Sequence, residues 1–256
     1  MAAAKKTPST SLAVAKKAST SIVSIQEQLK AQAEQMAERT APASGNTIRV
    51  TQDKMFLLPD GTKTSGPLEL VIVDFISSNK FYEGAYDPKD VSPPACFAIG
   101  NKPNALVPSD NSPLKQASEC SKCPMNQFGS AGNGKACKNA RVLAVLPPDA
   151  DEDDPMWLLN VSPTALKAFD AYVGSIARSF SAPPVAVVTK VSFDENVTYA
   201  SLRFSDPAPN ENLAVHFARQ DEARDLLNAE PDVSQFQTAQ SPARGGKPSA
   251  RPAARR

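Results

Sequence analysis

The four cysteines of this 256-residue chain all lie in one stretch, from Cys96 to Cys137. With Cys120 and Cys123 between these two, the spacing is C-x23-C-x2-C-x13-C. A tetrahedral zinc site needs four soft ligands that converge, and a CxxC turn supplies two of them from one tight loop. Pro124 and the glycines that follow it permit the turns that would bring the other two cysteines round. The spacing predicts a structural zinc site with four cysteine ligands, because such a site leaves no coordination position open for catalysis.

Other interpretations of the same cysteines are an iron–sulfur cluster, which uses an identical ligand set, and four unrelated buried thiols. A redox-active CxxC is disfavoured, because no strand followed by a helix surrounds Cys120. Residues 88–139 are rich in Pro, Gly, Asn, Ser and Lys, and a compact domain rarely contains so long a stretch without regular structure. A structural zinc contributes roughly 10 kcal/mol or more to the folding of small modules, which is enough to order this stretch. The single histidine, His216, lies far away in a segment that we expect to be a strand, and it is not expected to be a ligand.

Basic and aromatic side chains surround the cysteines. A single nucleic-acid strand is held by a positive groove along its backbone and by aromatic faces, each stacked base contributing about 1–3 kcal/mol. Packing is the alternative for each ring, and a solvated face is the alternative for each lysine. The combination predicts a nucleic-acid-binding surface. Its candidate residues lie in two stretches of the chain. They are Lys80, Phe81, Tyr82 and Tyr86 before the first cysteine, and Lys122, Phe128, Lys135, Lys138 and Arg141 in the cysteine loop.

The elements that must position these residues can be read from the hydrophobic pattern. Strands are predicted over 48–58, closed by a Pro-Asp-Gly turn, and over 66–84, which is apolar in its first half. After the cysteine region, further strands are expected at 141–148 and 156–162. Residues 183–195 and 197–205 alternate in polarity and predict a β-hairpin. A short strand at 213–217 and a helix near 221–229 complete the set.

One amphipathic helix is predicted between these strands. Ser162 is the expected N-cap and Pro163 the first helical residue. Apolar side chains recur at three- and four-residue spacing, which buries one face of the helix. The predicted buried positions are Leu166, Phe169, Val173, Ile176 and Phe180.

This order of elements predicts a mostly β fold with accessory helices. Five strands with one helix between the third and the fourth form the oligonucleotide-binding (OB) topology, and an α+β sandwich is the alternative. We therefore expect an OB-like five-stranded barrel over 46–230, with a zinc-binding insertion at about 88–140. Residues 1–45 would form a basic low-complexity tail plus a helix at 22–39, which could dock on the domain or pair with another copy. Residues 231–256 would be a disordered basic tail.

Charge and hydropathy limit the possible classes of protein. The net charge is +1, but five of the six residues in 149–154 are acidic, and the last sixteen residues carry five cations and no acid. The acidic run is expected to be a solvated turn. No apolar run is long enough for a bilayer, and the N-terminus lacks the core of a secretion signal, so we expect a cytoplasmic protein without a membrane partner. No carboxylate pair is placed for metal-dependent hydrolysis, and we predict no enzymatic activity.

Three segments, "PPACFAIGNKP", "CSKCPMNQFGS" and "GKACKNARVLAVLP", resemble phage-type zinc-containing single-stranded DNA-binding proteins, also called helix-destabilising proteins. The resemblance is strongest over Phe81–Pro147, weaker to Phe204 and absent in both tails. It implies a zinc subdomain inserted in an OB fold, with the four cysteines as zinc ligands and strand-binding residues beside them. The basic C-terminal tail differs from the acidic tail by which many such proteins recruit partners.

The predicted function is single-stranded DNA binding with low sequence specificity, in phage DNA replication or recombination. Proteins of those processes are expected partners, and the N-terminal helix could mediate self-association. The host cytoplasm is the expected location if the protein is phage-encoded. The alternative is a phage structural or host-interaction protein, in which the zinc-ordered loop binds a protein partner.

Overall fold

The computed structural model describes residues 28, 32, 45–84, 92–234 and 236. The chain divides into two compact units, 1–45 and 46–256, and every strand and helix named below belongs to the second. Most of the predicted N-terminal helix at 22–39 lies outside the described residues, as do Tyr86 and the C-terminal tail from residue 237.

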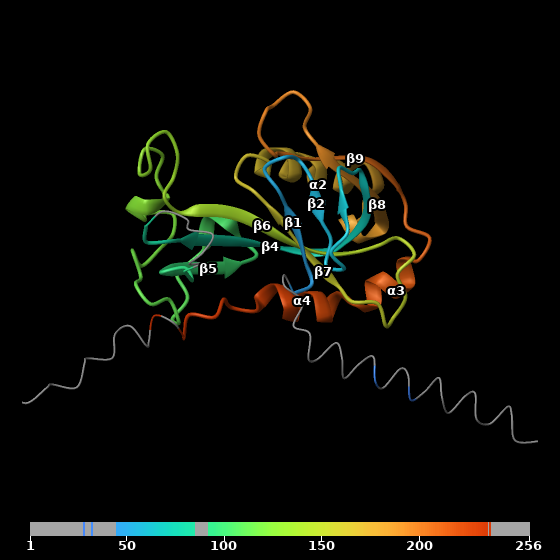
Figure 1. The fold of residues 1–256 in the computed structure, drawn as a ribbon, viewed down its shortest axis with the longest axis horizontal. Coiled ribbons are helices and arrows are strands. Elements are labelled where there is room, and N and C mark those ends of the chain that lie inside the picture. Colours follow the sequence, from blue (N-terminus) through green and yellow to red (C-terminus); the bar gives the residue numbers. More distant parts are fainter. Residues whose placement is uncertain (1–27, 29–31, 33–44, 85–91, 235, 237–256) are drawn as a thin grey trace, which may run out of the picture. The chain divides into compact units, whose positions relative to one another are not determined.

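A nine-stranded mixed sheet forms the body of the second unit (Figure 1). Its hydrogen-bonded order is β3-β2-β1-β7-β6-β4-β8-β9, and β5 also pairs with β4. Among the described strands, only the pairing of β1 with β7 is parallel. The strands are β1 (Thr47–Val50), β2 (Phe56–Leu57), β3 (Lys63–Thr64), β4 (Leu68–Phe81), β5 (Cys96–Gly100), β6 (Lys138–Leu146), β7 (Trp157–Val161), β8 (Val187–Phe193) and β9 (Leu202–Pro209).

The long strand β4, with 14 residues, connects the sheet to the cysteine region. β6 pairs along one edge of β4, from Val71 to Lys80. β8 and β5 share the other edge, β8 at Leu68–Val71 and β5 at Ser77–Phe81. The first half of β4 therefore lies in the main sheet, and its second half carries the insertion.

The sheet curls so that strands from opposite ends of its order meet. The ring of Phe56 in β2 stacks on Phe193 in β8, with 4.5 Å between their centroids. The main core collects buried side chains from β1, β2, β4, β6, β7, β8, β9 and the helix α2. Among the described strands, no backbone pairing joins the end strands β3 and β9. The prediction of a mostly β fold is confirmed, and the sheet is curled and open.

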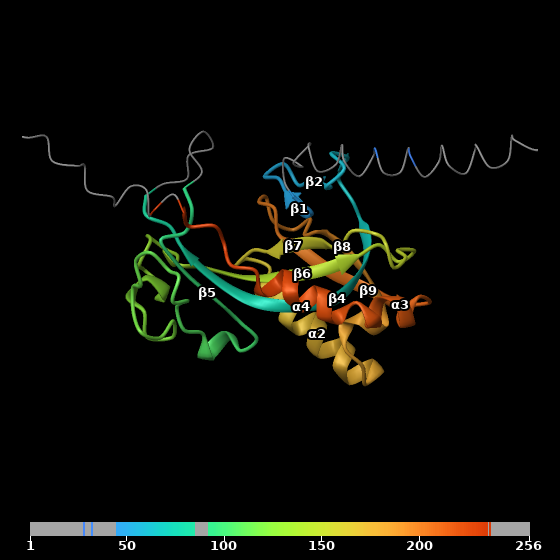
Figure 2. The ribbon, with the colours of Figure 1, turned by 90° about the horizontal axis from the view of Figure 1, so that it is seen from below.

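Helices pack against both faces of the sheet, and Figure 2 shows α4 lying along β4. α2 (Leu166–Phe180) packs in the main core, and α4 (Gln220–Asn228) packs on the other face. Residues of β4 alternate between the two cores: Leu70 and Ile72 face α2, whereas Val73 lies in the cluster that contains Ala223 and Leu227 of α4. This alternation follows from the two-residue period of a strand.

The amphipathic helix is present, but two details of the prediction were wrong. The helix begins at Leu166 with Ala165 as its N-cap, so Ser162 and Pro163 lie in the preceding turn, in which the Ala165 amide donates to the Ser162 carbonyl. Phe180, at the end of the helix, is 45% exposed. Tyr172 is buried as well, and its hydroxyl donates to Thr189 Oγ1 at 2.9 Å.

The expected strand at 213–217 was also wrong, because these residues belong to the short helix α3 (Leu213–Ala218). The alternation of apolar residues there suited a strand, but α3 follows the turn at Asn210–Asn212 and brings His216 under the surface. His216 is fully buried, and its Nδ1 contacts the side-chain amide of Asn210. The predicted helix near 221–229 is confirmed as α4.

The prediction of one strand over 48–58 was wrong, because β1 and β2 form an antiparallel pair joined by a turn at 51–55. The acidic run is an exposed turn, as predicted. Residues 151–154 form a turn in which the Asp151 carboxylate accepts hydrogen bonds from the backbone amides of Asp153 and Asp154. The described part of the 88–139 stretch contains β5 and the 3-10 helices η1 (Pro103–Ala105) and η2 (Pro124–Asn126), and is otherwise irregular. A third such helix, η3 (Pro184–Ala186), precedes β8. None of the helices among the described residues has the length and hydropathy that crossing a bilayer requires.

Candidate functional site

The four cysteines come together from three parts of the chain. Cys96 opens β5 and pairs in register with Phe81, Cys137 directly precedes β6, and the CxxC pair lies on the loop between them. All four are buried and carry free thiols. They line one small cavity of about 10 Å³, together with Asn79, Phe81, Phe97, Ala98, Pro108, Gln116 and Asn126. That volume is roughly what one water-sized sphere occupies.

Backbone and amide hydrogen bonds hold the loop around this cavity. The Cys123 amide donates to the Cys120 carbonyl at 3.4 Å, and the Cys137 amide donates to the Met125 carbonyl at 2.8 Å. The side chain of Asn126 donates to the Cys120 carbonyl at 2.8 Å. The CxxC turn, η2 and the start of β6 are thus joined by contacts of their own.

Burial and electrostatic interactions between the thiols raise the pKa of two of them. Burial raises the pKa of Cys137 to about 12, and the neighbouring sulfurs of Cys120, Cys123 and Cys96 contribute to the same rise. Burial also raises the pKa of Cys120, against a hydrogen bond from Asn79 that lowers it. Within the described residues, no group of three or more His, Cys, Asp or Glu side chains is arranged as a metal-ion site. The ligand types and the shared cavity nevertheless suit a soft divalent metal.

Part of the predicted nucleic-acid-binding set lies on the outer side of this loop. Phe128 is 81% exposed, and the ammonium of Lys135 lies 5.1 Å from its ring centroid. Lys122 is exposed and paired with Glu119 at 2.9 Å. Lys138 is exposed as well. The insertion therefore presents an exposed ring in contact with one cation, Lys135, at its surface.

The remaining predicted residues are less exposed, although Lys80 pairs in register with Lys138 and Phe81 lines the cysteine cavity. Arg141 is buried, and its guanidinium binds the carboxylate of Asp170 at 3.1 Å. Lys80 and Phe81 are half-buried near the end of β4, and burial lowers the pKa of Lys80. Tyr82 is 40% exposed, and burial of part of its ring raises its pKa. Tyr86 is outside the described residues.

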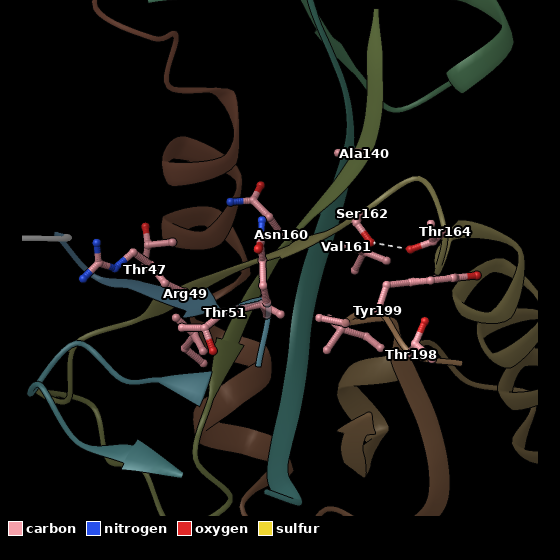
Figure 3. Close-up of a pocket in the computed structure, with 15 residues that line it drawn as sticks. Thr47, Arg49, Thr51, Ala140, Asn160, Val161, Ser162, Thr164, Thr198 and Tyr199 are labelled. Carbon is pink, nitrogen blue, oxygen red and sulfur yellow. Dashed lines mark hydrogen bonds between the residues drawn. The ribbon is translucent and has the colours of Figure 1, made fainter. Parts of the chain in front are cut away.

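A groove that the sequence did not predict opens over β1, β6 and β7, with a volume of about 890 Å³ (Figure 3). Figure 3 shows β1 residues on one side and the loops after β7 and β8 on the other, with Asn160 and Val161 between them. Tyr199, in the β8–β9 loop, is 53% exposed. The residues that line the groove are Thr47, Ile48, Arg49, Val50, Thr51, Gln52, Ala140, Asn160, Val161, Ser162, Thr164, Thr198, Tyr199, Ala200 and Leu202. These residues come from four separate segments, which no local sequence pattern groups together. Only Tyr199, an aromatic residue in a hairpin turn, could have indicated the groove.

No protein-family model, no curated protein and no solved structure matches this chain. The resemblance to phage-type single-stranded DNA-binding proteins therefore stays a prediction. The cysteine cavity and the groove are neighbours along β6. Ala140 of β6 lines the groove and Cys137 precedes the same strand, about 10 Å apart at the rise of a β-strand.

Lys54 holds the wall of the groove that carries Tyr199. It lies in the turn between β1 and β2, and its ammonium donates to the carbonyls of Asp194 at 2.9 Å and of Val197 at 2.5 Å. These contacts tie the β1–β2 turn to the β8–β9 loop across the curl of the sheet. Lys54 also has a positive φ of 56°, a conformation that Asn tolerates better than most residues.

Lys54→Asn is expected to loosen the β8–β9 loop while leaving the sheet intact. Asn keeps the backbone conformation but is too short to reach the two carbonyls, so about 1.5–3 kcal/mol of charge-assisted hydrogen bonding is lost. Hydrogen exchange should become faster at residues 195–200, and exchange in the rest of the sheet should not change. Lys63→Asn, at an exposed position in β3, is the matched control. Unchanged exchange at 195–200 would show that the loop is held by other contacts.

Proposed function

We propose that this chain is a non-enzymatic single-stranded DNA-binding protein that acts in DNA replication or recombination, with its groove as the main binding surface. The observation that carries the proposal is the position of the groove. The groove lies over β6 and β7 and beside the β8–β9 loop, and the cysteine insertion leads directly into β6.

The connectivity of five strands supports this assignment. β4, β6, β7, β8 and β9 are neighbours in the order β7-β6-β4-β8-β9, with α2 between β7 and β8, as expected for an OB fold. OB folds bind oligonucleotides on the face of their second and third strands and with the loops after their first and fourth strands. With β4 as the first strand, these are β6, β7, the cysteine insertion and the β8–β9 loop. β7 pairs with β1 rather than with β9, so the curled sheet is not closed into a barrel by a pairing of β7 with β9.

The chemistry of the lining suits a single strand. Tyr199 offers a ring face on which a base can stack, and Arg49 offers a cation for a phosphate. Threonine and serine hydroxyls and the amides of Gln52 and Asn160 supply hydrogen-bonding groups that do not select one base. Phe128 with Lys135 would extend the surface onto the insertion. Low sequence specificity follows, because stacking and phosphate contacts accept every base.

In this proposal Cys96, Cys120, Cys123 and Cys137 bind a structural zinc ion. When bound, zinc would fix the loop that presents Phe128 and would take no part in chemistry, since four protein ligands fill its coordination. An iron–sulfur cluster would use the same four thiolates, and elemental analysis of the purified protein distinguishes it from zinc.

Fluorescence titration with an oligo(dT) strand and with a duplex of equal length tests the proposal. The single strand should bind much more tightly than the duplex, and its affinity should fall steeply with salt, because cations that contact phosphates release counterions. Strands of different sequence should bind with similar affinity. Equal affinity for strand and duplex, or no binding near about 100 mM salt, would contradict the proposal.

A protein-binding role is the second candidate, and an apolar surface away from the groove favours it. Leu213 and Phe217 of α3 are 40% and 55% exposed. They line an apolar hollow of about 560 Å³ with Ala182, Pro183, Val185, Ala186 and Ala214. If the chain is a phage structural or host-interaction protein, Phe217→Ala should abolish assembly, and Tyr199→Ala should have no effect.

A further inference from the structure

Strand β4 places an asparagine next to the four cysteines. In Figure 1 the second half of β4 runs between β5 and β6. Asn79 of β4 pairs in register with Ala98 of β5 on one side and with Asn139 of β6 on the other. Cys96 and Cys137 lie two residues before these partners, and residues two apart on a strand share a face. Asn79 therefore lies between the two cysteine-bearing strands, and it lines the cavity with the cysteines.

The side-chain amide of Asn79 is held in one orientation. Asn79 is 5% exposed, and its Oδ1 accepts a hydrogen bond from Asn139 Nδ2 at 2.5 Å. The oxygen and the NH₂ of an amide point in different directions, so an oxygen directed at β6 leaves the NH₂ for the cavity. There Asn79 donates a hydrogen bond to the sulfur of Cys120 on the loop. Asn139 thus determines which end of the Asn79 amide the sulfur meets.

A donor at this position favours the metal-bound form of the site. A hydrogen bond to sulfur stabilises a thiolate more than a neutral thiol, because the thiolate carries the charge. A zinc ion with four thiolate ligands keeps a net negative charge, and all four cysteines are buried. Buried charge is costly unless it is paired or hydrogen-bonded. An amide directed at one of the sulfurs lowers this cost.

We propose that Asn79 is a positioning residue of the metal site, oriented by Asn139 so that its N–H donates to the sulfur of Cys120 when that sulfur is a metal ligand. This inference rests on the zinc site of the proposed function and adds two residues that are not ligands. Residues that hydrogen-bond to metal ligands orient them, and replacing such a residue typically lowers metal affinity by about 10- to 100-fold.

Asn79→Asp tests the donor. Asp has the same size and can still accept the hydrogen bond from Asn139, but it presents an oxygen to the sulfur in place of the NH₂. The Zn²⁺ affinity of the full chain, measured by competition with a chromophoric chelator, should fall by about 10- to 100-fold. Asn79→Leu, of similar size and without charge, should lose affinity in the same range, which separates the missing donor from the added charge.

Asn133→Asp is the matched control. It adds the same charge at an exposed position in the loop before Cys137, and it should bind Zn²⁺ as tightly as the natural chain. If Asn79→Asp and Asn79→Leu also bind Zn²⁺ as tightly as the natural chain, the inference is overturned.

Asn139→Asp tests the orientation of the amide, because Asn139 is not one of the residues that line the cavity. A carboxylate at position 139 can only accept, so the Asn79 amide should turn its NH₂ toward β6 and its oxygen toward Cys120. Zn²⁺ affinity should then fall as it does in Asn79→Asp. If only the substitutions at Asn79 lower the affinity, the orienting role of Asn139 is wrong.

Co²⁺ bound in place of Zn²⁺ separates the hydrogen bond from a general loosening of the loop. A hydrogen bond lowers the energy of the sulfur electrons, so its loss should move the thiolate-to-cobalt absorption band to longer wavelength. The band should shift in Asn79→Asp and Asn139→Asp and stay unchanged in Asn133→Asp. An unshifted band together with weaker Zn²⁺ binding would overturn the inference, because the substitutions would then act on the stability of the loop.

The metal titrations contain no DNA, so their outcome is independent of strand binding. A natural chain that binds neither Zn²⁺ nor Co²⁺ contradicts the zinc site and this inference with it. A chain that binds metal with the expected losses in the variants, but binds no single strand, contradicts only the proposed DNA-binding function. A chain that binds both, with no change at Asn79, contradicts this inference alone.

Discussion

Protein purified without chelator is expected to contain one zinc ion per chain, and Cys123→Ser is expected to lose it and to unfold the insertion. The reason lies in how little apolar surface the insertion buries on its own. Its separate cluster consists only of Ala98, Leu106 and Cys120 among the described residues. The apparent free energy of zinc binding to small modules is roughly 10–16 kcal/mol, and it is available to folding because the ligands converge only in the folded chain.

The loss of structure in Cys123→Ser should be confined to the insertion. The main core of β1, β2, β4, β6–β9 and α2 contains none of the four cysteines, so far-ultraviolet circular dichroism should keep most of its strand signal. Hydrogen exchange should become fast at the Cys137 amide, which now donates to Met125, and at the Cys120 amide, which donates to Leu106. Amides in β8 and β9 should stay protected.

Ser121→Ala is the matched control for this substitution. Ser121 lies inside the CxxC turn, is exposed, and contributes only its backbone carbonyl to the described hydrogen bonds, which Ala retains. It should keep both the metal and the protection of the Cys137 amide. Elemental analysis decides the outcome. If it finds iron and sulfide, the four cysteines bind an iron–sulfur cluster and not zinc. If the natural protein contains no metal and its Cys137 amide is still protected from exchange, hydrogen bonds alone order the loop.

The parts of the fold that the sequence predicted are those governed by local periodicity. Alternation of Val187, Thr189, Val191 and Phe193 indicated the buried face of β8, and all four are buried. The three- and four-residue spacing indicated α2. The four cysteines could be grouped because no others occur in the chain, and they line one cavity.

The parts that the sequence did not predict depend on contacts between distant segments. The parallel pairing of β1 with β7 rests on two residue pairs, Thr47 with Leu158 and Ile48 with Leu159, which no local pattern reveals. The groove is a consequence of that pairing. Arg141 shows the same limit, because its charge suggested a phosphate contact, whereas Asp170 of α2, which binds it, is identifiable only in the folded chain.

Tyr199→Ala is expected to weaken oligo(dT) binding by about 5- to 150-fold while leaving the fold unchanged. A stacked base contributes about 1–3 kcal/mol, and each 1.4 kcal/mol corresponds to a factor of about ten in affinity. Tyr199 is 53% exposed in a loop, so its removal leaves no cavity in the core. Phe128→Ala should have an effect of similar size, because its ring is the most exposed of the large apolar side chains in the described residues. The two losses should add in the double variant, since the rings belong to different loops and share no described contact.

Two controls separate stacking from other effects of these substitutions. Tyr199→Phe keeps the ring face and should bind as the natural chain does, whereas a requirement for the hydroxyl would make Phe as weak as Ala. Phe217→Ala removes an equally exposed ring from the apolar hollow at α3, away from the groove, and should leave strand binding unchanged. If Phe217→Ala weakens binding and Tyr199→Ala does not, the strand lies at α3, and the groove over β6 and β7 must have another occupant. If Tyr199→Ala, Phe128→Ala and Phe217→Ala all bind oligo(dT) as tightly as the natural chain, stacking on these rings contributes nothing to affinity. An unchanged slope of log K against log salt would then identify the cations, rather than the rings, as the binding surface.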